Sequence, residues 1–407
     1  MIQYQFNSSS LISEYETVPI IDLGQHGFAD SFYPIELKEI ASNTAPLVCS
    51  LDKTTGLVQL QNITVAKDRY DLVDYSYTSS NSQISRQHWI EFFDSVTNNI
   101  NLRNGQILEI GSNDGYLLSL FKQITNNVVG IDASTAMVDE ANSRGIQTVH
   151  GIFGDTEVFN SNIGNGEKKF DAVIANNVLN HSNKPLKFIK EVSLLLNEDG
   201  VFIFEVPYWY NTISSLKFDQ IYLEHITYFT VGSLEHLLST AGLYINEVEL
   251  VDYHGGSLRV YSSFNKECSS NKEKFILLED NLKLKDEITY VLYMEKVNQV
   301  RDNFCKNLAK LKEKKPASTV FGIGAAAKAN TLLTYYGLNS QSVEFIVDSS
   351  PFKQGKITPV SLIPIMDDES LTKIPNGIGI ILAWNLSDSL KNKLLSINKD
   401  IEFLDIL

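Results

Sequence analysis

Four short apolar runs in the middle of the chain predict the strands of a parallel sheet. Each run is rich in Ile, Val, Leu or Phe, and they cover residues 106–110, 127–132, 170–175 and 200–206. Longer stretches of mixed polarity separate them, as helices would. Strands that are covered on both faces read as continuous apolar runs, so this pattern predicts an α/β domain with helices on both sides of its sheet.

The parts on either side of this domain have different patterns. Short apolar runs at 18–23 and 57–60 alternate with polar turns, which predicts a small, mostly β lobe. Residues 85–98 are expected to form a helix before the first central strand. Residues 286–314 repeat apolar positions at three- and four-residue steps and predict one long amphipathic helix, which Pro316 would end.

A second, smaller α/β unit is predicted near the C-terminus. Its strands are expected at 319–322, 343–347, 378–384 and 401–404, with a helix that runs through Leu333. The chain therefore divides into an N-terminal lobe (1–68), a central α/β domain (69–265), and a long helix with a C-terminal Rossmann-like domain (266–407).

Composition excludes several classes of protein. The net charge of −15 argues against nucleic-acid binding, which requires clustered cations. The three cysteines are far apart and lack CxxC spacing, which excludes a disulfide framework and a cysteine-based zinc site. The longest apolar runs are too short to span a bilayer, and the first residues do not read as a signal peptide. We therefore expect a cytoplasmic protein with no membrane partner, as a monomer or a small homo-oligomer.

The first central strand leads into a glycine turn within the segment ILEIGSNDGYLLSLF. Gly111 and Gly115 allow close backbone approach, and Asp132, twenty-one residues after Gly111, could accept both hydroxyls of a ribose. This geometry suits an adenine dinucleotide or S-adenosylmethionine. Asn113 stands where a dinucleotide motif has its second glycine, and Glu109 suits the cationic amino-acid end of the methyl donor. Both details favour S-adenosylmethionine.

Residues 205–261 are rich in groups that can do chemistry. If the segment around FDQIYLEH is helical or turn-like, Tyr222 and His225 lie on one face, and Glu224 points elsewhere, either to orient the histidine or to contact ligand. A histidine is a suitable base for a carbon-bound proton beside a ketone, and tyrosines could donate hydrogen bonds to the enolate oxygen. Read as structure alone, the aromatic side chains would be core.

Five further residues are candidates, four of them for the same site and Asn176 for contact with the methyl donor. His254 and Gly255 belong to a flexible turn that could approach a ligand, and Arg259 could pair with a phosphate. Asn176 ends the strand at 170–175, and His181 follows it; His181 could face the site or could cap the next helix.

A second glycine turn reads Gly322-x-Gly324-x-x-x-Lys328, and Asp348 ends the next strand. It could bind a nucleotide, with Lys328 at a phosphate, or it could serve packing alone. It lacks the GK[ST] ending of a Walker motif.

The chain resembles the sugar C-methyltransferase family that makes branched-chain deoxysugars. The resemblance covers most of the chain and rests on segments in the family's order: GLVQL, YSYTSSNS, EIGSNDGYLL, ANNVLNH, EVPY, FDQIYLEHITYFT, HGGSLRVY, GIGAAAKANTLLTYYG, VDSSPFKQGK and ILAWN. The resemblance implies a class I S-adenosylmethionine-dependent methyltransferase domain, no catalytic metal, and a nucleotide-linked keto sugar as the partner.

The resemblance also implies roles for individual residues. His225 would be the base, and Glu224, Tyr222 and a tyrosine of the YSY stretch would surround it. Tyr75 is the closest match for that tyrosine, with Tyr77 as the near alternative. His181 also falls on an active-site position of the family.

The family's C-terminal domain helps to enclose the nucleotide sugar. Lys328 and Asn330, in the second glycine turn and the helix after it, are therefore expected to face the ligand.

One departure from the family lies in the N-terminal lobe. Members usually carry a structural zinc site of two cysteine pairs, but here Asp52 and Thr55 occupy the places of the second pair, and the first pair is missing from FNSSSLIS. We therefore expect no zinc there and a lobe that is held by packing.

Three alternatives stay open. The first is methylation of a hydroxyl or amino group of a related sugar. The second is an oxidoreductase that binds NAD at the second glycine turn through Asp348, and the third is a non-catalytic homologue that binds sugar nucleotides. Retention of Tyr222, Glu224 and His225 argues against the third.

Overall fold

The computed structural model describes residues 1–71, 78–80, 82–154, 169–253, 255–266 and 271–406. Its central feature is a seven-stranded sheet of order β13-β14-β11-β10-β7-β8-β9. The strands are β7 (Ile107–Ile110), β8 (Val128–Asp132), β9 (Thr148–His150), β10 (Phe170–Asn176), β11 (Leu196–Pro207), β13 (Tyr244–Val251) and β14 (Ser257–Ser263). β14 is antiparallel to both of its neighbours, β11 and β13, and the other neighbouring strands of this sheet are parallel.

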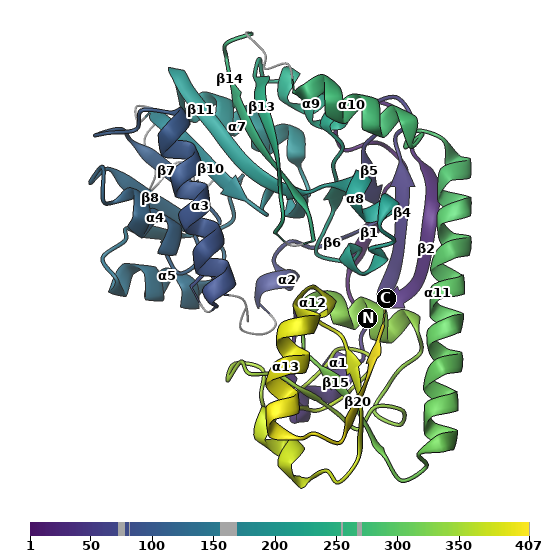
Figure 1. The fold of residues 1–407 in the computed structure, drawn as a ribbon. Helices are drawn as coiled ribbons and strands as arrows, with labels where there is room; N and C mark the ends of the chain where they lie inside the picture. Colours follow the sequence, from purple (N-terminus) through teal and green to yellow (C-terminus); the bar gives the residue numbers. More distant parts are fainter. Residues whose placement is uncertain (72–77, 81, 155–168, 254, 267–270, 407) are drawn as a thin grey trace.

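Helices cover both faces of this sheet, as the continuous apolar runs predict (Figure 1). On one face, Phe92 and Phe121 pack against Ile107. On the other face, Phe188 and Leu234 pack in the core that contains Leu108. The helices are α3 (Gln83–Asn99), α4 (Tyr116–Phe121), α5 (Thr135–Ser143), α7 (Pro185–Leu195) and α9 (Val231–Ser239). The predicted α/β domain with helices on both faces of its sheet is confirmed.

The N-terminal lobe is mostly β, and its main sheet has the order β12-β5-β4-β2. Its elements are β1 (Tyr4–Phe6), β2 (Val18–His26), β3 (Tyr33–Pro34), η1 (Ile35–Leu37), α1 (Lys38–Ala41), β4 (Ala45–Leu51), β5 (Val58–Leu60), β6 (Asn62–Thr64) and α2 (Asp68–Asp71). The edge strand β12 (Thr227–Tyr228) comes from the central region, so this sheet crosses the boundary predicted at residue 68.

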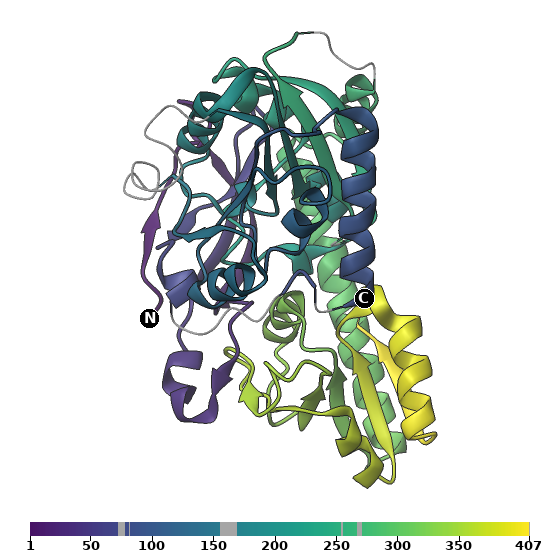
Figure 2. The same cartoon turned by 90° about the vertical axis from the view of Figure 1, so that its left-hand side faces the viewer.

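The C-terminal region begins with α10 (Lys272–Asn281) and the long helix α11 (Glu287–Lys314), which runs along one side of the molecule (Figures 1 and 2). A five-stranded parallel sheet follows, in the order β18-β16-β15-β19-β20. Its elements are β15 (Thr319–Ile323), α12 (Ala327–Tyr335), β16 (Phe345–Val347), β17 (Lys356–Ile357), β18 (Ile365–Met366), η5 (Asp368–Lys373), β19 (Gly377–Ile381), η6 (Trp384–Leu386), α13 (Ser387–Ile397) and β20 (Ile401–Asp405).

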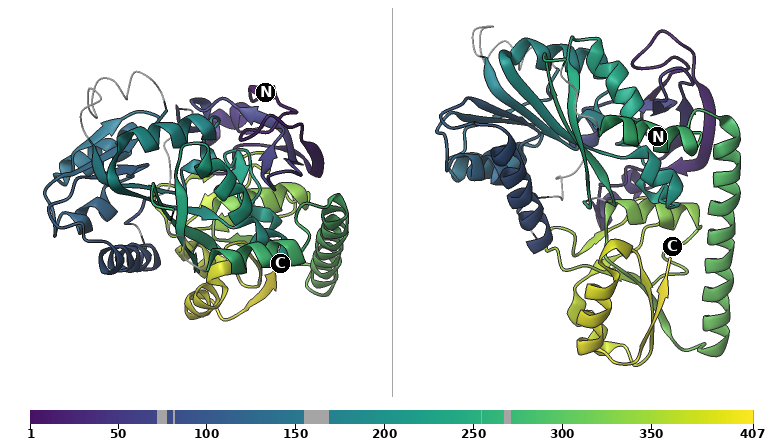
Figure 3. Two further views of the ribbon diagram at one scale, coloured as in Figure 1. Left: turned by 90° about the horizontal axis from the view of Figure 1, so that it is seen from above. Right: turned by 45° about the horizontal axis from the view of Figure 1, so that its top comes forward.

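The three regions share one hydrophobic core. Ile21 of the lobe, Phe218 of the central region, Val297 of α11 and Ile346 of the C-terminal sheet belong to the same buried cluster. In addition, β17 pairs with β3 of the lobe. Figure 3 shows the lobe and the C-terminal region side by side against the central domain. The central domain therefore shares buried contacts with both of the other parts.

Hydrogen bonds close the N-terminal lobe around Asp52 and Thr55, the positions at which the family resemblance implies a cysteine pair. The buried Asp52 carboxylate accepts the N–H groups of Thr54 and Thr55 at 2.9 and 3.2 Å, and the hydroxyls of Thr55 and Ser13 at 2.8 and 2.7 Å. Burial alone would raise the pKa of Asp52, but hydrogen bonds from Ser13, Ser10 and Thr55 outweigh it and hold the pKa below its usual value. This set of one carboxylate and three hydroxyls, already bonded together, does not suit zinc, which takes thiolate or imidazole ligands. The expectation that the lobe is held by packing stays a prediction, and these hydrogen bonds add to it.

Candidate active site

The first glycine turn joins β7 to α4 and has the backbone that the sequence indicates. Gly111 and Gly115 adopt φ of +73° and +74°, and a Cβ on Gly111 would lie 2.3 Å from the Val178 side chain. Asn113 also has a positive φ, of 51°. The Asp132 carboxylate, at the end of β8, accepts the Asn113 N–H at 2.8 Å and so fixes the turn. The sequence motif therefore forms one connected unit.

Three carboxyl groups lie close together at this turn. Glu109 is almost fully buried on β7, and burial, then Asp114 and Asp132, raises its pKa well above the usual value. Burial likewise raises the pKa of Asp132. A bound cation would relieve this accumulation, since it favours the ionised form of each carboxyl group.

Unsatisfied polar atoms at the same place fit the methyl donor. Among the described residues, Glu109 Oε2 and both side-chain polar atoms of Asn176 are buried without a hydrogen-bond partner. S-adenosylmethionine carries an ammonium, a sulfonium and a ribose, so the carboxylates, the amide and the close turn suit its groups. We infer that Glu109, Gly111, Asn113, Gly115, Asp132 and Asn176 hold the donor.

The second part of the site is the turn that follows the 3₁₀ helix η4 (Phe218–Gln220). The N–H of His225 donates to the Tyr222 carbonyl at 3.0 Å, and this turn brings the two rings to 3.9 Å between centroids. His225 Nδ1 lies 3.1 Å from the Gln220 carbonyl oxygen. A carbonyl can only accept, so Nδ1 carries the proton and the lone pair of the neutral ring is on Nε2. Tyr222 and His225 therefore lie together, as the sequence predicts.

His181 approaches from η3 (Leu179–His181), which follows β10. Its ring centroid lies 4.9 Å from that of His225, at 88° between the ring planes. The Ile226 N–H donates to the Asn180 carbonyl at 2.8 Å and ties the two segments together. Of the two interpretations that the sequence left open for His181, contact with the site is the one that the structure favours.

Glu224 points away from the histidine ring towards the N-terminal lobe. Its carboxylate accepts the N–H of Asp30 at 2.8 Å and that of Ala29. Glu224 Oε2 is buried without a partner among the described residues. Burial raises the pKa of Glu224 to about 7. The backbone carbonyl of Gln220 therefore orients His225, while Glu224 joins the site to the lobe.

Arg259 requires a correction. The sequence suggests that it pairs with a phosphate, but it lies within the sheet on β14 and is almost fully buried. Its guanidinium forms salt bridges to Glu205 at 2.8 Å and to Glu249 at 3.1 Å, over the ring of Phe92. Two carboxylates already satisfy this cation. Its role is therefore structural, since a phosphate contact would break this buried network.

Gly255 packs against residues 218–225, the segment that carries Tyr222 and His225 and that we call the catalytic turn. It adopts φ of +84°, and a Cβ there would lie 2.2 Å from Gln220 Nε2. Its carbonyl accepts a hydrogen bond from Lys217 Nζ at 2.6 Å. Gly255 thus packs against the residue that orients His225.

The second glycine turn repeats the geometry of the first. Gly324 has φ of +86°, and the Asp348 carboxylate accepts the Ala325 N–H at 2.7 Å. Lys328 Nζ lies 3.9 Å from the ring centroid of Trp384 and donates to Asn385 Oδ1 at 2.6 Å. Burial lowers the pKa of Lys328 to about 8. Contact of Lys328 with the ligand stays a prediction.

Asn330 lies at the junction of the lobe and the C-terminal region. It is buried on α12, and its amide nitrogen donates to the Ala29 carbonyl at 2.6 Å. The next residue, Thr331, donates its hydroxyl to the Ile221 carbonyl at 3.0 Å. Asn330, predicted to bind substrate, thus holds the loop whose N–H groups bind Glu224.

Tyr75, Tyr77 and His254 lie outside the described residues, so their predicted roles stay predictions. Sequence patterns missed other residues of the site, because their roles depend on contacts between distant segments. These residues are Asp30, Arg69, Asp114, Asn180 and Gln220.

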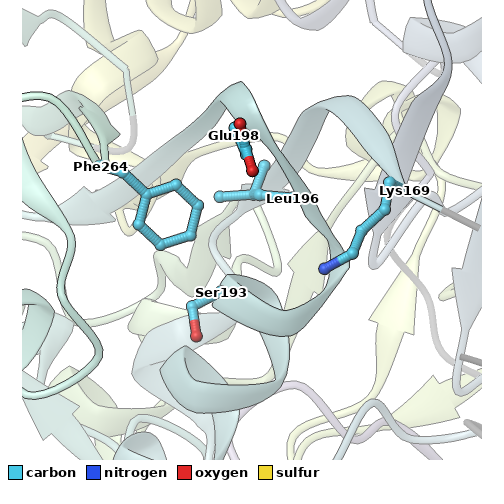
Figure 4. Close-up of a pocket in the computed structure, with 5 residues that line it drawn as sticks. All are labelled: Lys169, Ser193, Leu196, Glu198 and Phe264. Atoms are coloured by element: carbon cyan, nitrogen blue, oxygen red, sulfur yellow. The ribbon is translucent and has the colours of Figure 1, made fainter.

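A pocket of about 300 Å³ lies away from this site, near the start of β10 and β11 (Figure 4). Lys169, Ser193, Leu196, Glu198 and Phe264 line it. Ligands of open α/β sheets bind at the carboxyl ends of the strands, so this pocket is not the candidate site. In the described part of the chain, no group of three or more His, Cys, Asp and Glu side chains is arranged to hold a metal ion. None of the described helices is long and apolar enough to cross a bilayer.

The central domain and the C-terminal region each match a known protein family. Residues 82–248 match a family model described as a methyltransferase domain, and residues 252–403 match one described as a C-methyltransferase C-terminal domain. The C-methyltransferase NovU of Streptomyces niveus is 31% identical over 335 residues, which cover 81% of this chain and 77% of that protein. A ubiquinone biosynthesis O-methyltransferase of Pelagibacter ubique is 32% identical over 100 residues, 25% of this chain and 41% of the other.

Solved structures resemble about half of the chain. The PH0226 protein of Pyrococcus horikoshii covers 48% of this chain and 98% of its own, with a TM-score of 0.38 and 21% identity. NovU matches four fifths of the chain. The two family models match the domain that contains the first glycine turn and the C-terminal region. The chain belongs to the C-methyltransferase family and is an S-adenosylmethionine-dependent methyltransferase.

Proposed function

We propose that this enzyme methylates a carbon adjacent to the keto group of a nucleotide-linked keto-deoxysugar, with His225 as the base. The observation that carries the proposal is the contact of His225 Nδ1 with the Gln220 carbonyl oxygen at 3.1 Å. With its Nδ1 proton donated to the Gln220 carbonyl, the neutral ring has its lone pair on Nε2, as a base for a carbon-bound proton requires.

The residues around His225 support the same chemistry. Removal of the proton turns the sugar ketone into an enolate, whose oxygen becomes negatively charged. The Tyr222 and His181 rings lie 3.9 and 4.9 Å from the His225 ring between centroids, so a hydroxyl and an imidazole N–H close to the base could donate hydrogen bonds to that oxygen. S-adenosylmethionine supplies an electrophilic methyl group, and the enolate carbon is the nucleophile.

The order of the site along the sheet also favours this reaction. Asn176, among the donor-binding residues, ends β10, and His181 follows it five residues later. The His181 ring contacts the ring of the proposed base, His225, at 4.9 Å between centroids, so donor and base would meet near the carboxyl end of β10, where positioning can supply much of the rate acceleration. For the nucleotide part of the substrate we propose Lys328, in the C-terminal region, as a ligand contact.

The test is an incubation with methyl-labelled S-adenosylmethionine and a panel of nucleotide-linked 4-keto deoxysugars. We expect product with a new carbon–methyl bond, and a loss of at least about 1000-fold in His225→Ala, since this variant lacks the general base. His236→Ala is the matched control, because His236 contacts the Ile12 carbonyl in the lobe and not the site.

Label on an oxygen or nitrogen of the sugar would replace the proposal with the first alternative. Donor binding by calorimetry without transfer to any keto sugar would contradict the proposed substrate class.

A further inference from the structure

Arg69 is a buried cation that links three segments of the candidate active site. It lies in the one-turn helix α2, directly after β6, and its residue is 5% exposed. A charged side chain is rarely buried to this degree unless hydrogen bonds compensate it. The compensating groups show what Arg69 does.

The guanidinium is bound to backbone carbonyls on both catalytic segments. Nη1 donates to the His181 carbonyl at 2.7 Å and lies 3.5 Å from the Glu224 carbonyl. Nη2 donates to the Thr64 carbonyl at 3.3 Å and to the side-chain oxygen of Asn183. Asn183 in turn donates to Thr64 at 2.9 Å. One planar group thus joins β6, the His181 segment and the catalytic turn.

These bonds bear directly on the two histidines. His181 and His225 come from segments 44 residues apart, yet their rings are in edge contact at 4.9 Å. Arg69 holds the backbone of His181 itself and of the residue before His225. Because a guanidinium is rigid and planar, its separate N–H groups fix the relative positions of the carbonyls that they bind.

We propose that Arg69 is a positioning residue, which sets the distance and angle between His181 and His225. The proposal rests on the proposed function, since it gives the two rings their catalytic use. A misplacement of reacting groups by about 1 Å can cost on the order of 100-fold in rate. Loss of Arg69 therefore affects turnover more than binding of the methyl donor, whose residues lie on β7, β8 and β10.

The test compares Arg69→Gln, Arg69→Lys and Arg103→Gln with the wild-type enzyme. Arg103 is an exposed arginine in the loop before β7 and is the matched control. We expect Arg69→Gln to lower kcat by about 10- to 100-fold, with KM for the sugar and Kd for the donor within about twofold. We expect Arg69→Lys to restore only part of kcat, because its ammonium keeps the charge but reaches fewer of the carbonyls than the guanidinium does.

A second readout needs no turnover. In the histidine ring NMR spectrum, Arg69→Gln shifts the His181 and His225 signals and leaves those of His26 and His236, which lie in and against the lobe, in place. If the wild type methylates no keto sugar, the proposed function fails while this spectrum still decides the role of Arg69. Unchanged His181 and His225 signals, or a fall in kcat that matches a fall in folded fraction, would overturn the inference.

Discussion

Single residues of the site are constrained by atoms that are far away in the sequence. Gly111 must be glycine for two reasons, its φ of +73° and the Val178 methyl that a Cβ would meet at 2.3 Å. Glu224 is held by two N–H groups of the N-terminal lobe and has a pKa of about 7. Gly111 leads to a prediction about donor binding, and Glu224 leads to one about the pH dependence of stability.

The first prediction concerns Gly111→Ala. We expect it to weaken donor binding by at least about 100-fold, because the new methyl group displaces Val178 and deforms the turn. Gly242→Ala is the control: it has the same φ of +73° but no atom within 4 Å of the new Cβ. Titration calorimetry measures both. Equal donor affinity in the two variants would show that the Val178 contact has no effect.

The second prediction uses the raised pKa of Glu224. A carboxyl group whose folded pKa is about 7 contributes stability in its protonated form, and this contribution is lost as the pH rises from about 4.5 through 7. Glu224→Gln cannot ionise, so its stability relative to wild type rises over that range, by up to about 3 kcal/mol.

Urea unfolding at pH 5 and pH 8 measures this difference. Glu36→Gln, at an exposed glutamate, should show no such change between the two pH values. A Glu224→Gln difference that is the same at both pH values would contradict the buried, neutral carboxyl group.

At the scale of elements, hydrogen bonds to Asp52 connect two turns of the N-terminal lobe. Asp52 receives hydrogen bonds from Ser13 in one turn and from Thr54 and Thr55 in its own turn. The bond to Ser13 joins segments that are 39 residues apart, and the remaining bonds shape the second turn.

The third prediction is that Asp52→Asn lowers the free energy of unfolding by about 1–3 kcal/mol, since it replaces charge-assisted hydrogen bonds and alters one acceptor. Asp22→Asn is the control, because Asp22 is exposed on β2 and accepts the N–H of Gly24 two residues along the same strand. Chelators should not change the melting temperature of the wild type. A chelator-induced fall in melting temperature would contradict a lobe held by these hydrogen bonds.

The sequence predicts most of the elements but few of their junctions. The strand predicted at 106–110 is observed as β7, and the helix at 286–314 as α11, because both patterns are long or strongly buried. The strand β12 is two residues long and leaves no periodic signal, yet it joins the central region to the lobe.

The same division holds for the site. Gly111 and Asp132 belong to a strand–turn–helix motif, and His225 belongs to the short segment FDQIYLEH. Each is recognisable in a local stretch of sequence and can therefore be predicted. Arg69 and Gln220 act through backbone carbonyls of distant segments. A carbonyl contact selects no particular partner in the sequence, so only the folded structure reveals these roles.

At the scale of the whole molecule, the C-terminal region supports the active site through α12. Asn330 binds the Ala29 carbonyl in the loop that holds Glu224, and Thr331 binds the Ile221 carbonyl in the catalytic turn. The C-terminal region thus contacts the catalytic turn directly, in addition to any contact with the nucleotide.

The fourth prediction is that Asn330→Ala lowers kcat by about 10-fold and leaves donor affinity unchanged. The variant loses the hydrogen bond to the Ala29 carbonyl, which holds the loop whose N–H groups bind Glu224. Asn398→Ala is the matched control, since Asn398 bonds the carbonyls of Leu371 and Ile374 within the C-terminal region. Steady-state kinetics and calorimetry separate the two effects. Equal kcat in the two variants would show that α12 does not support the site.

The central claim is that His225 removes a carbon-bound proton beside the sugar's keto group. The most direct measurement is NMR of the nucleotide-linked keto sugar in D₂O with enzyme and S-adenosylhomocysteine, so that no methyl group can be transferred. The account predicts exchange of that one proton for deuterium by the wild type, and at least about 1000-fold slower exchange by His225→Ala. Methyl transfer without enzyme-catalysed exchange at that carbon, or exchange that persists in His225→Ala, would contradict it.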